Sequence, residues 1–168
     1  TSGEYASIFI DGSWNANIND NIFKNDNSGE NVIENSGTGT LNVENNYWGS
    51  NNPATSLNPE NWIIFEATSN ASEIYNDESA QITVSVALND GSAAVSHLPN
   101  YPIQVTLSAA GTLSQQTVTL NNGVAKFVIS NLNIGTKNVW AFYDGDKNHN
   151  GNRSLASFKV MPRVPIVN

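Results

Sequence analysis

The chain has no cysteine, which excludes disulfide staples and thiolate metal sites. It also lacks any run of 18 apolar residues, so the sequence contains no candidate transmembrane helix. No signal peptide is visible, and the chain starts at Thr1 and not at a methionine. We therefore expect it to be an excised piece of a longer protein whose signal and anchor lie elsewhere.

Basic residues are scarce in the first part of the chain. Up to Ser69, nine acidic residues stand against a single base, Lys24, for a net charge of −8, whereas the remainder carries six acids and six bases. Binding to nucleic acid depends on Lys and Arg that displace the counterions of phosphates, and anionic membranes also attract basic segments. Nucleic acid is therefore not an expected partner, and we expect no membrane insertion of this segment.

Helix signals are nearly absent, and asparagine-rich repeats take their place. Apolar residues occur as short islands or as alternations bounded by Gly, Pro or Asn. Laying Ile18 on Val43 aligns the stretch 17–23 with the stretch 42–48. The spacing from Ile18 to Val43 is the length of one repeat, and a self-similar period of that length predicts a solenoid whose coils stack on one another.

The alignment also predicts what asparagine and the aromatic residues do in the coils. Asn21 falls on Asn46, and Phe23 falls on Trp48. Asparagine tolerates the left-handed backbone of tight corners, and in register its side chains can form ladders between coils. Trp48 and Trp62 are expected to plug the end of the solenoid, because a terminal coil must have its apolar face covered.

The second part of the chain alternates with the period of β-strands. Residues 82–88 and 103–107 alternate apolar with polar side chains, and turn signals follow at 89–91 and 121–123. About seven strands in about 95 residues predict an immunoglobulin-like (Ig-like) sandwich. The expected fold is thus all-β, in two domains. The first, at 1–69, is the C-terminal coils and cap of a right-handed parallel β-helix, and the second, at 70–168, is an Ig-like β-sandwich.

Several of these stretches are similar to a known family. Residues 45–49, Asn-Asn-Tyr-Trp-Gly, with Asn-Asn-Pro at 51–53 and Trp62, resemble the end of the β-helix in adhesin-like surface proteins of methanogenic archaea. Residues 121–127 and 139–151 resemble the bacterial Ig-like repeats that follow such helices. The resemblance implies an extracellular, cell-surface stalk or adhesin that is not an enzyme. Its pectate lyase-like β-helix would present a binding face to a glycan or a surface protein, and the Ig-like domain would act as a spacer.

One loop has the spacing of a calcium site. Asp146, Asn148 and Asn150 recur at every second position before a glycine, and Asp144 could add a ligand. The twelfth position would be Ser157 and not the bidentate glutamate, and no flanking helix is expected. The alternative is a polar turn without an ion. We therefore expect no cofactor, with a weakly bound calcium ion as the open possibility.

The runner-up function is the C-terminal part of a β-helix polysaccharide lyase or glycoside hydrolase. Asp11 and Glu34 are predicted to stack on adjacent coils about 5 Å apart, a separation that also suits the carboxylate pair of a retaining glycosidase. A lyase would need a basic side chain, and only Lys24 and His97 occur before Ala125. The alternative for the two acids is that they are solvated surface residues.

Trp14 is the candidate for contact with carbohydrate. It lies in Gly-Ser-Trp-Asn, a predicted corner, where an exposed indole face could pack against a sugar ring. Asn70 and Asn152 each begin an N-glycosylation sequon at an expected surface position, although such tripeptides also arise by chance in a chain rich in Asn and Ser.

Overall fold

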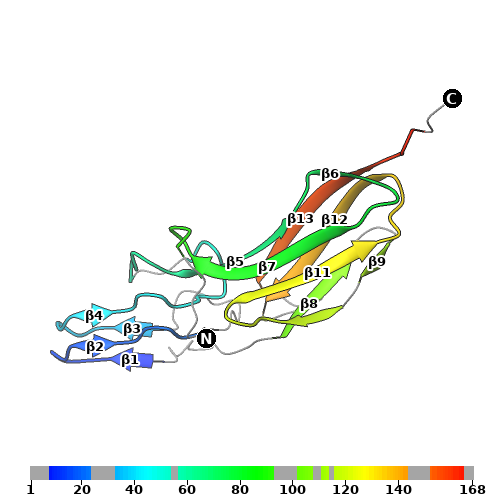
Figure 1. Cartoon of the computed structure of the whole chain (residues 1–168). Coiled ribbons are helices and arrows are strands. Elements are labelled where there is room, and N and C mark those ends of the chain that lie inside the picture. The colour runs from blue at the N-terminus through cyan, green and yellow to red at the C-terminus, as the bar shows by residue number, and fades with distance from the viewer. Residues whose placement is uncertain are drawn as a thin grey trace, which may run out of the picture.

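The computed structural model describes residues 8–23, 33–53, 57–92, 102–107, 111–113, 116–143 and 152–164. The regular secondary structure in these residues consists of β-strands alone, and these residues contain no helix that could cross a membrane. Figure 1 shows a small stacked unit at one end of the chain and a β-sandwich at the other.

The stacked unit consists of two layers of chain that pair in parallel. Ile8 lies opposite Ile33, and an isolated bridge places Ile22 opposite Tyr47. Strand β1 pairs with β3, and β2 pairs with β4. Ile8 lies opposite Ile33 and Ala16 opposite Leu41, the same residue offset that separates Ile18 from Val43 in the sequence repeat. The strands are β1 (Ile8–Ile10), β2 (Ala16–Asn17), β3 (Ile33–Asn35) and β4 (Leu41–Asn42).

The two layers also have the same backbone geometry at one corner. We call residues 8–23 the first layer and residues 33–49 the second layer. Asp20 and Asn45 occupy equivalent positions of the two layers, and both have a φ of 60°. Asp and Asn adopt this left-handed conformation more readily than other residues with a side chain. The corner geometry therefore repeats with the sequence period.

The apolar interior of the layers is closed by tryptophan. Ile33 and Val43 are buried, and Trp48 is 8% exposed. The Phe23 and Trp48 rings stack with their centroids 5.0 Å apart, as the alignment of these two positions predicts. Partly buried residues complete this cluster: Ile8, Ile10, Ile18, Leu41, Leu57 and Trp62.

Two sheets form the sandwich. The five-stranded sheet has the order β10-β8-β12-β13-β6, and the four-stranded sheet has the order β5-β7-β11-β9. Neighbouring strands are antiparallel except β13 and β6, which are parallel. The strands are β5 (Ile63–Ser69), β6 (Glu73–Tyr75), β7 (Ala80–Leu88), β8 (Pro102–Leu107), β9 (Thr112–Leu113), β10 (Thr117–Thr119), β11 (Val124–Ser130), β12 (Gly135–Tyr143) and β13 (Asn152–Met161).

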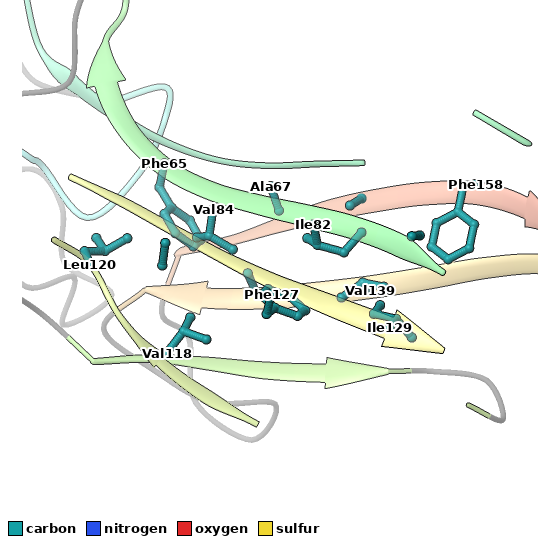
Figure 2. Packing of buried hydrophobic residues seen from close by; sticks show 14 of the residues in the cluster. Phe65, Ala67, Ile82, Val84, Val118, Leu120, Phe127, Ile129, Val139 and Phe158 are labelled. Carbon is teal, nitrogen blue, oxygen red and sulfur yellow. The ribbon is translucent and has the colours of Figure 1, made fainter. Parts of the chain in front are cut away.

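The sandwich core follows from the alternation of apolar residues along each strand. In β7, every second side chain from Ala80 to Val86 is fully buried, and in β12 Val139 and Ala141 are fully buried. Figure 2 shows Ile82, Val84 and Val139 between the two sheets, with Phe127 of β11 among them. Burying each large apolar side chain contributes about 1.5–3 kcal/mol, so this cluster is the main stabilising feature of the chain.

The predicted turn at 121–123 is confirmed. Asn122 and Gly123 have φ values of 49° and 76°. The amide of Asn121 donates to the carbonyl of Val124 at 2.9 Å, and the amide of Val124 donates back at 3.1 Å. Two consecutive left-handed residues are what a tight hairpin turn requires, and Asn-Gly is the pair that adopts them most easily.

The layers and the sandwich share both a hydrogen-bonded ladder and a core. Asn46 and Trp62 form a parallel bridge, and the amide of Ile63 donates to the carbonyl of Asn46 at 3.0 Å. Tyr47, which belongs to the second layer, is fully buried in the same cluster as the sandwich core. Strand β5, which lies before the boundary expected at residue 69, pairs with β7 and is a strand of the sandwich.

Candidate functional site

The two turns at residues 11–15 and 36–40 are stacked at the end of the layers that points away from the sandwich (Figure 1). We call these residues the tip. Main-chain hydrogen bonds join the two turns: Thr38 donates to the carbonyl of Gly12 at 2.7 Å, and Ala16 donates to the carbonyl of Thr40 at 2.9 Å. The two turns of the tip are therefore held against each other through the backbone.

Glycines let the turns of the tip stack this closely. A Cβ on Gly37 would overlap the carbonyl oxygen of Gly12, and a Cβ on Gly39 would overlap the carbonyl oxygen of Trp14. Gly12 itself has a φ of 91°, which is in the region that favours glycine. The second turn thus supports the first through backbone contact, with no side chain between them.

Trp14 is the most prominent side chain of the tip. It is 77% exposed, in contrast to Trp48 in the interior. Its indole lies over Gly12, with Cδ1 and Nε1 both 3.3 Å from the position that a Cβ would take on that residue. The structure therefore places Trp14 at an exposed corner, where the sequence predicts it.

The predicted pair of carboxylates is not formed, and this expectation was wrong. Glu34 lies opposite Phe9, and the amide of Ser36 bonds to the carbonyl of Ile10 at 2.9 Å. The strands keep the offset of the repeat here, and in that register the position equivalent to Asp11 is Ser36 and not Glu34. Both acids are exposed. Within residues that the structure describes, no group of acidic or histidine side chains could hold a metal ion.

The predicted calcium residues Asp144, Asp146, Asn148 and Asn150 lie outside the described residues, so that site stays a prediction.

The two predicted glycosylation sites are in different settings. Asn70 is exposed, and its Oδ1 accepts a hydrogen bond from the amide of Gln81 at 2.8 Å. Asn152 is the first residue of β13, where its backbone pairs with Tyr143. Modification of either residue stays a prediction.

Sequence reasoning missed how polar side chains seal the junction between the layers and the sandwich. The Glu44 carboxylate accepts hydrogen bonds from the amides of Glu60 at 3.1 Å and Asn61 at 2.6 Å. The Asn51 side chain accepts from the amide of Phe65 and donates to its carbonyl, both at 2.7 Å. The only signal for these roles was the position of both residues next to the end of the repeat.

At the opposite end of the sandwich, Arg163 fastens the chain as it leaves β13. Its Nε lies 2.7 Å from the Asp77 carboxylate, and its guanidinium lies over the Tyr75 ring at 4.5 Å. A second, longer contact of 3.3 Å joins it to Glu78. The hydrogen bond to Asp77 raises the pKa of Arg163 above its ordinary value. The point of exit is thus held against the turn after β6.

Comparison with known proteins identifies the sandwich. Residues 67–161, more than half of the chain, match the family described as bacterial Ig-like domain (group 3). None of the curated proteins compared with the chain matches it.

Solved structures with a similar fold include two from intimin. The D0-D1 domain of intimin is 19% identical, with a TM-score of 0.45 over 57% of this chain and 47% of that one. The D00-D0 domain of intimin is 15% identical, with a TM-score of 0.41 over 70% and 53%. The chain therefore spans about half the length of these structures.

A third solved structure is the CARDB domain of a Pyrococcus furiosus protein in complex with di-metal ions. It is 21% identical, with a TM-score of 0.40 over 60% of this chain and 94% of that one. At these identities and scores, none of the three likenesses indicates what the chain binds.

Proposed function

Because the chain belongs to the bacterial Ig-like domain (group 3) family, we propose that it is a non-enzymatic segment of an extracellular, cell-surface adhesin or stalk. In this proposal the sandwich is a spacer, and the layers present a binding face to a glycan or a surface protein. Glu34 lies opposite Phe9 and not opposite Asp11, and the absence of that carboxylate pair favours this function over a glycoside hydrolase.

The proposal includes a fold for the first part of the chain. We infer that residues 1–69 are the last coils and cap of a right-handed parallel β-helix, joined to the Ig-like domain at 70–168. The constant offset between paired residues and the repeated corner at Asp20 and Asn45 support this assignment. The resemblance to adhesin-like proteins of methanogenic archaea remains a prediction.

The observation that carries the proposal is the position of the tip relative to the point where the chain leaves β13. The tip lies at one end of the molecule, and the chain leaves β13 at the far end of the sandwich (Figure 1). Arg163 is held there by Asp77 and Tyr75. The sandwich therefore separates the tip from the point where the chain leaves β13, which is the geometry that a spacer needs.

The junction supports the same function because it is bonded on both sides. On the side of the layers, the amides of Glu60 and Asn61 donate hydrogen bonds to the Glu44 carboxylate. On the side of the sandwich, the amide of Trp62 donates to Asn89 Oδ1 at 3.0 Å, and the amide of Asn89 donates to the carbonyl of Trp62 at 2.9 Å. A segment whose backbone is engaged in this way has little freedom to act as a hinge.

Surface labelling of cells tests the proposal. An antibody raised against the chain should label intact cells that naturally produce the protein, and protease added outside those cells should remove the signal. Labelling that requires permeabilised cells, with the protein resistant to external protease, would contradict a role at the surface.

A further inference from the structure

We propose that the tip is a carbohydrate-binding site in which Trp14 stacks on one face of a neutral sugar ring. This inference rests on the proposed function, since it names what the layers would present. The first step is that Trp14 contributes little to folding. Its side chain is 77% exposed, and its indole lies over Gly12, which has no side chain to bury it.

The second step is that the backbone under Trp14 is held in place. The amide of Thr40 donates to Asn15 Oδ1 at 2.9 Å, and the amide of Ser36 donates to the carbonyl of Ile10 at 2.9 Å. Gly39 brings the second turn against the carbonyl of Trp14 itself. An aromatic residue with two side-chain torsions on a fixed backbone loses little conformational entropy when a ligand binds.

The third step is the chemistry around the ring. Ser13, Asn15 and Thr38 are exposed residues of the tip. The two hydroxyls and the Nδ2 group of Asn15 have no hydrogen-bond partner among the residues described. An exposed apolar plane that shares the tip with hydroxyl and amide groups matches a sugar ring, which has C–H groups on its faces and hydroxyls at its rim.

The fourth step is charge, which limits the kind of sugar. Asp11 and Glu34 are exposed, and Lys24 is the only basic residue before position 70. A uronate, sulfate or phosphate would therefore meet carboxylates and little that could neutralise it. The ligand that fits is a neutral hexopyranose, bound weakly by one stacking contact and strengthened when many copies bind together.

Binding to a panel of glycans tests the site, with the whole chain displayed in many copies on beads. Neutral hexose oligosaccharides should bind, and polyuronates should not. In solution, titration with the neutral glycan that binds best should shift the indole signal of Trp14 and the amide signals of residues 11–15 and 36–40. The other three indole signals should remain unchanged.

Variants distinguish specific stacking on Trp14 from non-specific hydrophobic binding. Trp14→Ala should weaken binding at least tenfold, and Trp14→Phe should recover part of the loss because it restores an aromatic face. Phe9→Ala is the matched control, since Phe9 is 59% exposed in the same layer and lies outside the tip. It should leave binding unchanged.

The site would be overturned if no neutral glycan bound, if binding survived Trp14→Ala, or if Phe9→Ala caused an equal loss. Binding to a protein ligand through Trp14 with no binding to glycans would also overturn it. None of these outcomes bears on whether the chain lies at the cell surface, so failure of the site and failure of the proposed function are distinguishable.

Discussion

The side chain of Asn21 donates a hydrogen bond through Nδ2 to Oδ1 of Asn46 at 3.1 Å, across the two layers. The backbone amide of Asn21 donates to the same oxygen at 3.0 Å. Asn46 is fully buried, and its Nδ2 donates to the carbonyls of Ile18 at 2.6 Å and Val43 at 2.7 Å. Three of these four hydrogen bonds join the two layers, and the bond to Val43 lies within the second layer.

Asn46→Ala should destabilise the chain by about 3 kcal/mol, because it leaves buried donors and acceptors without partners. Chemical denaturation of the purified chain measures this change. Asn21→Ala is the matched variant at the equivalent position of the first layer, where the side chain is exposed, and it should cost about 1 kcal/mol or less. Equal losses in the two variants would contradict the role assigned to Asn46.

Gly39→Ala should disturb the tip, because its Cβ would overlap the carbonyl oxygen of Trp14. We expect a loss of about 2 kcal/mol or more, together with shifted amide signals in residues 11–15. Gly91→Ala is the control, since a Cβ there meets nothing within 4 Å and only the positive φ opposes it. Its cost should be about 1 kcal/mol. Unchanged tip signals in Gly39→Ala would show that the turns are not in backbone contact.

Asn51→Ala should expose the backbone of Phe65 in β5 to solvent. The Asn51 side chain bonds both the amide and the carbonyl of Phe65, as a neighbouring strand would. Hydrogen exchange of the Phe65 amide should become faster by about tenfold or more. The exposed neighbour Asn52 provides the control, and Asn52→Ala should leave that exchange rate unchanged. Similar rates in the two variants would rule out the seal.

Arg163→Ala should free the end of the chain with little effect on the rest of the sandwich. The ion pair with Asp77 is about half exposed, so water and salt screen it. The amide of Asn76, which donates to the carbonyl of Met161 at 3.0 Å, should exchange faster while the core amides keep their protection. A large fall in the unfolding midpoint would mean that Arg163 stabilises the whole fold.

The parts of the fold that follow from local sequence periods could be predicted. The repeat of stretch 17–23 at 42–48 predicted the register of Ile22 with Tyr47, and the alternation in residues 82–88 predicted the buried face of β7. The pairing of Asp11 with Glu34 was predicted wrongly, because a position out of register with the repeat lands on a different neighbour. Only residues separated by the full repeat period lie opposite each other, and Asp11 and Glu34 are not separated by that period.

The junction could not be predicted because its contacts join residues with no shared pattern. Glu44 reads as one more surface acid, yet its carboxylate binds the amides at 60 and 61. Tyr47 reads as an apolar residue of the coil, yet it is buried in the sandwich core. For the candidate site, the sequence predicted an exposed Trp14, but it did not predict the glycines that support the turn beneath it.

The central claim is that the layers and the sandwich form one rigid body, which holds the tip at a fixed distance from the point of exit. The chain has no cysteine, so Thr38→Cys and Lys159→Cys introduce a single pair of thiols for spin labels, one at the tip and one on the exposed side of β13. The account predicts a single narrow distribution of distances between the two labels by pulsed electron paramagnetic resonance. A broad or multiple distribution would show a hinge at the junction and would contradict the claim.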